Sequence, residues 1–138
     1  MAVIDEMRTA HPEIRIREQI NVDVPVACDT GRLQQVLSNL LGNAYHHGAK
    51  GEPIVVDVHV EGETLEISVT NSGDCIAASD LLKIFEPYWR PSTSNPGGGL
   101  GLGLYICSEI VKAHAGSLYA NSTPEQGTRF IARIPVHL

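Results

Sequence analysis

A stretch rich in proline and glycine between Pro87 and Gly101 constrains this chain more than any other feature. Pro87, Pro91 and Pro96 each fix φ and lack a backbone donor, and the run of three glycines from Gly97 has no side chains to pack. Regular structure cannot cross such a segment, so we predict a mobile loop there. The helices and strands of the fold must therefore lie on either side of it.

The chain before this loop carries the patterns of a strand and a long helix. Apolar and charged residues alternate from Ile14 to Ile20, which predicts that a half-buried strand opens the domain. A helix is predicted next, with Asp29 as its N-cap and Gly48 as its stop. Its apolar positions recur at helical spacing and are Leu33, Val36, Leu37, Leu40, Leu41 and Ala44.

Paired strands and a second long helix complete the predicted elements. Two β-rich segments, 53–60 and 64–70, flank a turn at Gly62 and are expected to form an antiparallel hairpin. A short helix is predicted over 77–84. Beyond the loop we expect a helix marked by Leu102, Ile106, Ile110 and Ala113, followed by strands over 117–120 and 128–136.

This order of elements predicts a single α+β domain over residues 1–138. The paired antiparallel strands differ from the alternating βαβ order of a doubly wound sheet. We therefore expect a two-layer sandwich in which helices cover one face of a mixed, mostly antiparallel sheet. A chain of 138 residues with 43% hydrophobic content suits one core.

Charge and hydropathy exclude several classes of function. The balance of 10 basic and 16 acidic residues gives a net charge of −6, which would repel a nucleic-acid backbone. No apolar run approaches the roughly 20 residues of a membrane span, and residues 1–10 do not form a signal peptide. We therefore expect a cytoplasmic protein with no membrane segment in this chain. Cys28, Cys75 and Cys107 lack the spacing of a zinc site or a disulfide framework.

Two polar patterns carry candidate chemistry. Gln35, Asn39 and Asn43 recur every four residues and form a stripe beside the apolar face of the long helix. On its own this stripe fits a solvated face as well as a functional one. The glycines from Gly97 to Gly103 place bare backbone before a helix N-terminus, where unpaired N–H groups and the helix dipole favour an anion. We therefore predict a phosphate site there, although the glycine patterns of the P-loop and the Rossmann fold are absent from the run.

Four motifs in these regions resemble those of one ATPase superfamily. Asn39-Leu-Leu-Gly-Asn43-Ala is similar to its N box, Asn71-Ser-Gly73-Asp-Cys75 to its first glycine box, Phe85-Glu-Pro87-Tyr to its F box and Gly99-Leu-Gly101-Leu-Gly103-Leu104 to its second glycine box. Together they resemble the histidine kinase branch of the GHKL superfamily, which includes gyrase, heat-shock chaperones and mismatch-repair proteins. The resemblance runs from about Ile14 to Pro135 and implies the Bergerat ATP-binding fold.

The resemblance also implies roles for individual residues. Asn43 would ligate Mg²⁺, Asn39 would line the phosphate site and Asn71 would hold the adenine amino group. His46 stands where the family often has a lysine near the phosphates, and Arg90 after the F box is a second candidate phosphate partner. The catalytic candidates are Asn39, Asn43 and His46. The remaining implied nucleotide contacts are Gly73, Ile76, Phe85, Gly99, Leu100, Gly101, Leu102, Gly103, Leu104 and Thr128.

Two positions depart from the family pattern. In the first glycine box, Asn71 occupies the position of the usual acidic residue, and Cys75 occupies the position of the second glycine. Such an Asn also resembles some phytochrome-type sensor kinases. A neutral amide would bind the adenine amino group less strongly than a carboxylate, and it could turn its NH₂ toward a carbonyl. We therefore expect weaker ATP binding and poorer discrimination against GTP.

The resemblance implies a sensor histidine kinase of a two-component system. Such a domain binds ATP with Mg²⁺ and transfers the γ-phosphoryl group to a histidine on a separate dimerisation domain, which in turn serves a response regulator. None of the 6 histidines here lies in a predicted long helical hairpin of that kind, so we expect a fragment of a longer kinase. Two alternatives stay open, a degenerate docking module that binds no nucleotide and an anti-sigma-type serine protein kinase.

Overall fold

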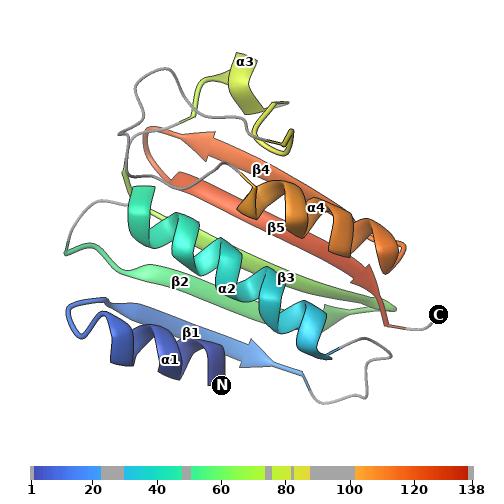
Figure 1. Ribbon diagram of the computed structural model, residues 1–138, viewed down its shortest axis with the longest axis horizontal. Coiled ribbons are helices and arrows are strands. Elements are labelled where there is room, and N and C mark those ends of the chain that lie inside the picture. Colours follow the sequence, from blue (N-terminus) through green and yellow to red (C-terminus); the bar gives the residue numbers. More distant parts are fainter. Residues whose placement is uncertain are drawn as a thin grey trace.

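A five-stranded sheet with helices against one of its faces forms the body of the protein (Figure 1). The computed structural model describes residues 2–22, 30–47, 51–73, 76–81, 83–87 and 102–136. In chain order the elements are α1 (Ala2–Ala10), β1 (Ile16–Asn21), α2 (Thr30–His47), β2 (Ile54–Glu61), β3 (Thr64–Asn71), α3 (Ala78–Leu81), α4 (Gly103–Ala113), β4 (Ser117–Thr123) and β5 (Gly127–Pro135).

The sheet is mixed, with the strand order β1-β2-β3-β5-β4. Strand β1 runs parallel to β2, and the other three neighbouring pairs are antiparallel. Helices α1, α2 and α4 all lie over the same face in Figure 1. The predicted α+β sandwich, with a mostly antiparallel sheet and its helices on one face, is confirmed.

The core lies between this sheet face and the two long helices. Along β2, Ile54, Val56 and Val58 are buried while the residues between them are more exposed, because successive side chains of a strand point to opposite faces. The helices contribute apolar stripes at helical spacing. Their buried residues are Val36, Leu37, Leu40, Leu41 and Ala44 from α2, and Cys107, Ile110 and Val111 from α4.

The prediction that a strand opens the domain is wrong, because helix α1 precedes β1. Val3 and Ile4 of α1 are buried in the core and Met7 packs against it, whereas the charged residues of the helix face away. Arg8 fastens the helix to the sheet, since its guanidinium donates to the Glu18 carboxylate at 2.8 Å and to the Ile16 carbonyl at 3.0 Å. The apolar spacing of this helix was visible in the sequence, but it spans only two turns.

The remaining predicted elements are confirmed within a few residues, and the hairpin pairs Glu61 with Thr64 across its turn. The helix predicted over 77–84 is shorter, at Ala78–Leu81. The proposed cap Asp29, the proposed stop Gly48 and most of the proline-rich loop lie outside the described residues. None of the helices in the described ranges is both long and apolar enough to cross a membrane.

The contribution of α1 to the core gives a first prediction. Ile4 has no exposed surface, so Ile4→Ala should lower the free energy of unfolding by about 2–5 kcal/mol through lost burial and a residual cavity. Glu6→Ala, on the exposed side of the same helix, should change it by less than about 0.5 kcal/mol. Urea denaturation of both variants measures the difference. Equal effects would show that α1 does not belong to the cooperative core.

Candidate functional site

The described candidate residues of the four motifs converge at one end of the sandwich. Helix α2 and strand β3 finish at this end, while α4 and β5 begin there (Figure 1). The side chain of Asn39 on α2 donates to the carbonyl of Gly103, the first residue of α4, at 3.4 Å. On the sheet, Asn71 of β3 is the direct partner of Thr128 of β5. Segments far apart in the sequence thus form one surface.

The polar stripe on α2 lies at the edge of the core. Asn39 and Asn43 are half-buried, while Gln35 and His46 are exposed. Residues four apart lie on one face of a helix, so Asn39 and Asn43 present their amides on the same side. Asn39 thus lies beside the start of α4, where the first backbone N–H groups have no partner within the helix.

Asn71 is the most unusual polar residue of this surface. It is only 3% exposed, and its amide nitrogen donates to the Ser72 carbonyl at 3.2 Å. Its Oδ1 is buried and has no hydrogen-bond partner among the described residues. An unsatisfied buried acceptor costs about 1–3 kcal/mol, so native proteins seldom keep one without a reason. Asn71 Oδ1 is therefore a candidate acceptor for a ligand that can donate a hydrogen bond.

A short hydrogen-bonded network connects Thr128 to the loop after β3. Thr128 is 4% exposed, and its hydroxyl lies 2.9 Å from that of Ser122 on β4. The Ser122 hydroxyl also accepts from the Ile76 backbone N–H at 2.7 Å. Sequence analysis missed Ser122, since a lone serine in a polar edge strand carries no signal. The network holds Ile76, the residue after the first glycine box, against β4 and β5.

Gly127 is a second residue that sequence analysis missed. Its φ of 79° is a left-handed conformation that glycine adopts readily and other residues rarely do. A Cβ added there would overlap the Asn71 carbonyl oxygen. The signal that could have found it is its place in the turn between two predicted strands. Gly127 lets β5 approach β3 closely enough to bring Thr128 opposite Asn71.

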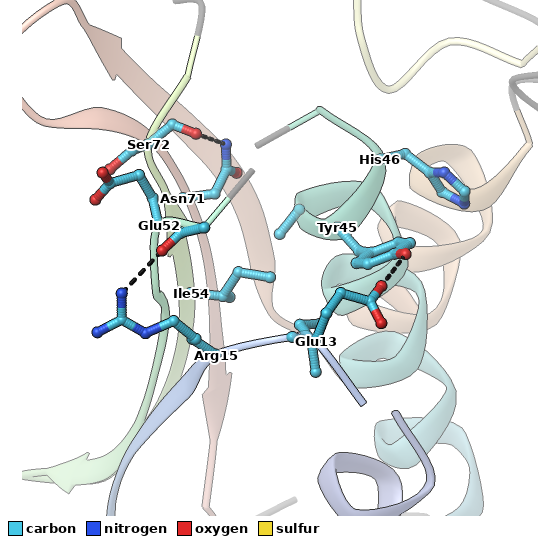
Figure 2. A pocket seen from close by; sticks show the side chains of 11 residues that line it. Glu13, Arg15, Tyr45, His46, Glu52, Ile54, Asn71 and Ser72 are labelled. Carbon is cyan, nitrogen blue, oxygen red and sulfur yellow. Dashed lines mark hydrogen bonds between the residues drawn. The ribbon is translucent and has the colours of Figure 1, made fainter. Parts of the chain in front are cut away.

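A cavity of about 390 Å³ opens beside Asn71 (Figure 2). Asn71, Ser72 and Ile54 line one side, and Tyr45 of α2 and Glu13 line the other. The complete lining is Glu13, Ile14, Arg15, Ala44, Tyr45, His46, Gly51, Glu52, Ile54, Asn71 and Ser72. Of the predicted site residues that the structure describes, only His46 and Asn71 line this cavity.

Tyr45 forms a fixed wall of the cavity that the sequence did not predict. Its hydroxyl donates to Glu13 Oε1 at 2.6 Å, and His11 stacks on its ring with the centroids 3.9 Å apart. The hydrogen bond lowers the pKa of Glu13 and raises the pKa of Tyr45. Both shifts favour ionised Glu13 beside neutral Tyr45, so the wall stays polar at neutral pH.

Several other predicted contacts pack partly into the core. Phe85 meets the buried ring of Phe130 edge to face at 6.3 Å, and Ile76 and Leu104 also pack against the core. Leu102 is the half-buried cap of α4. Gly73 has a φ of 144°, a conformation that favours glycine. Arg90, Gly99, Leu100 and Gly101, with the departing residue Cys75, lie outside the described residues.

Cys107 of α4 lies directly beneath the α2 stripe but is chemically quiet. It is fully buried, and its Sγ is 3.6 Å from the Val36 carbonyl. Burial raises the pKa of Cys107 to about 12, with a smaller opposing contribution from Asn39. The thiol is therefore neutral at physiological pH and serves packing rather than nucleophilic chemistry.

Comparison with known proteins identifies this arrangement. The family described as histidine kinase-, DNA gyrase B-, and HSP90-like ATPase matches residues 28–138. A bacteriophytochrome of Pseudomonas aeruginosa is 35% identical over 136 residues, which are 97% of this chain and 18% of that protein. The sensor histidine kinase RcsC of Escherichia coli is 38% identical over 122 residues, 86% of this chain and 13% of that protein. The chain thus spans less than a fifth of the length of these curated relatives.

Solved structures agree with these relatives. The catalytic domain of histidine kinase ThkA superposes with a TM-score of 0.80 at 30% identity, covering 97% of this chain and 86% of that one. Full-length ShkA in complex with AMPPNP superposes with a TM-score of 0.81 at 28% identity, covering 97% of this chain and 28% of that one. Both likenesses span nearly all of the present chain.

The close approach at Gly127 gives a second prediction, with Gly62 as its matched control. Both glycines have positive φ, but an added Cβ meets nothing at Gly62 and meets the Asn71 backbone at Gly127. Gly62→Ala should cost about 1–2 kcal/mol of unfolding free energy through its backbone conformation alone. Gly127→Ala should cost at least about 1 kcal/mol more, because the β3 and β5 backbones must separate. Equal losses in chemical denaturation would rule out that close contact.

Proposed function

The chain belongs to the family of histidine kinase-, DNA gyrase B- and HSP90-like ATPases, and on this premise we propose that it binds ATP with Mg²⁺ where Asn39, Asn43 and Asn71 converge. We further propose that it acts as the catalytic part of a sensor histidine kinase. Its curated relatives include sensor histidine kinases of which it spans only a part.

The buried Oδ1 of Asn71, which has no hydrogen-bond partner in the described part of the chain, carries the proposal. The adenine amino group is a donor, and a hydrogen bond to it would satisfy this acceptor. The cavity beside Asn71 has apolar walls from Ala44 and Ile54, as the flat faces of a purine require. In a docking module that binds no ligand, a buried acceptor without a hydrogen bond would only lower stability.

The orientation of the Asn71 amide revises the expectation about GTP. Its NH₂ group is held by the Ser72 carbonyl at 3.2 Å, and turning the amide would place two oxygens at that separation. We therefore propose that the oxygen faces the ligand. Guanine presents a carbonyl where adenine presents its amino group, so the site favours adenine. The amide discriminates as a carboxylate would, although its neutral hydrogen bond is weaker.

The phosphate end of the site belongs to α2 and α4. Asn43 would supply an amide oxygen to Mg²⁺, a cation that prefers hard oxygen ligands and keeps several waters. The ion would neutralise charge on the phosphates during transfer. Asn39 would stay fixed by its bond to Gly103 and orient the phosphates, and His46 would approach them from the exposed end of α2.

We infer that the phosphoacceptor comes from another part of the protein. His59 lies on the sheet face away from the helices, and His114 lies at the end of α4 opposite Gly103. We propose that a histidine ring nitrogen on a dimerisation domain attacks the γ-phosphorus. The bond to the β–γ bridging oxygen breaks, ADP leaves and the ring proton is lost to solvent or a base. A response regulator would then take the phosphoryl group.

Calorimetric titration with ATP, with and without Mg²⁺, tests the site through Asn43. The native protein should bind ATP more tightly with Mg²⁺, and Asn43→Ala should remove most of that gain because an oxygen ligand is lost. Gln35→Ala, on the exposed end of the same stripe, is the control and should leave both affinities unchanged. An equal loss with and without Mg²⁺ would exclude the metal role. No binding by the native protein would favour the docking module instead.

Nucleobase selection gives a separate prediction at Asn71. The native protein should prefer ATP to GTP by about tenfold or more. In the GTP complex the guanine carbonyl would face Asn71 Oδ1, and neither oxygen could form a hydrogen bond. Asn71→Asp should tighten ATP binding several-fold, by about 1 kcal/mol, through a charge-assisted hydrogen bond. Ser72→Ala keeps the backbone carbonyl that orients the amide, so it should leave the preference unchanged. Equal native affinities for the two nucleotides would contradict the fixed orientation.

A further inference from the structure

The outer face of the sheet carries a second cluster of polar side chains. None of the described helices covers this face, which is turned away from α1, α2 and α4 (Figure 1). His59 and Glu61 are two residues apart on β2, so they point to the same face. Glu66 of β3 is the direct cross-strand partner of His59. The hairpin thus brings three potential metal ligands together beside its turn.

The distances within this cluster suit a small cation. His59 Nε2 lies 3.1 Å from Glu66 Oε2 and 3.9 Å from Glu61 Oε2, and the donor atoms all lie within 4.8 Å of one another. Bonds of about 2.0–2.2 Å in a tetrahedral zinc site place donors roughly 3.3–3.6 Å apart. His59 and Glu66 are already near that spacing. Glu61, whose side chain is 73% exposed, has only to swing inward.

Asp57 gives this cluster a feature that surface carboxylates alone do not have. Its Oδ1 lies 2.8 Å from His59 Nδ1, so the imidazole donates Nδ1–H to the carboxylate. The lone pair of a neutral His59 is then on Nε2, which faces both glutamates. Metal-binding histidines are commonly oriented by a carboxylate in this way. The side chain of Glu66 is only 13% exposed, so the site is partly sheltered from water.

We propose that His59, Glu61 and Glu66 bind one divalent transition-metal cation of the Zn²⁺ class, with Asp57 as the residue that positions His59. One imidazole and two carboxylates suit zinc or a neighbouring first-row metal better than Mg²⁺ or Ca²⁺, which prefer all-oxygen cages. Water would complete the coordination. The bound ion would cross-link β2 and β3 next to their turn.

A proton on His59 and the nearby arginines compete with a metal ion for these ligands. The carboxylates raise the pKa of His59, most of all through its hydrogen bond to Asp57. A proton therefore competes with a metal for the His59 imidazole. Arg129 of β5 lies 4.0 Å from Glu66 Oε2, and Arg133 is the cross-strand partner of Glu66. Arg129, whose side chain is 45% exposed, is able to withdraw toward solvent when a metal binds.

This cluster is separate from the proposed nucleotide site. Glu66 is five residues from Asn71 along β3, which corresponds to about 17 Å, and the two side chains point to opposite faces of the sheet. The metal proposal therefore does not rest on ATP binding. Failure of one proposal would not imply failure of the other.

Calorimetric titration with Zn²⁺ tests the site on the whole chain. We expect one tight site in the native protein. His59→Gln or Glu66→Gln should weaken it at least about tenfold, and Asp57→Asn should weaken it about 10–100-fold through loss of orientation. His11→Gln is the matched control, since His11 also neighbours a glutamate, at 4.0 Å, but lacks the second carboxylate and the orienting partner. It should leave the affinity unchanged.

Cobalt supplies a second measurement on the native protein, in case a variant fails to fold. Co²⁺ should give the visible absorption of a tetrahedral or five-coordinate site with nitrogen and oxygen ligands, and Zn²⁺ should displace it. Histidine ring signals in NMR spectra should shift for His59 and not for His11. Native-like zinc affinity in folded His59→Gln, sulfur-to-cobalt charge-transfer bands, or weak binding at several sites would each overturn the proposal.

Discussion

The antiparallel ladder between β3 and β5 is the constraint on which the rest of the structure depends. It joins strands separated by the short helix α3, the proline-rich loop, α4 and β4, and its register sets Asn71 directly opposite Thr128. Gly127 permits the close approach, and Thr128 extends the contact through Ser122 to Ile76. With this ladder in place, α2 and α4 can cover a single continuous face and meet where Asn39 reaches Gly103.

Periodic features of the fold could be predicted from the sequence. The stripe from Val36 to Ala44 predicted α2 because a helix repeats its buried positions. The β-rich segment 53–60 before a turn predicted β2. The family resemblance also implied which residues share one site. Asn39 and Gly103, or Asn71 and Thr128, are indeed neighbours. The relation to histidine kinases is confirmed by the family match.

Features that depend on one contact were not predictable in the same way. Ser122 acquires its role only when β4 lies beside β5, and Tyr45 becomes a cavity wall only through Glu13. His59 and Glu66 are unremarkable in the sequence until the hairpin register pairs them. The orientation of the Asn71 amide likewise follows from the Ser72 carbonyl, which no motif records. Each depends on tertiary geometry rather than on residue type or period.

Strand β3 places different functional residues on its two faces, and this limits where the chain tolerates insertions and deletions. Asn71 and Glu66 belong to opposite faces of one strand, so their separation in sequence fixes which chemistry each face presents. A single-residue insertion or deletion between them would turn one of the two residues to the wrong face. Such a change would also bury polar groups and expose Ile67 or Val69. Between these two positions, natural variation should therefore proceed by substitution and not by insertion or deletion.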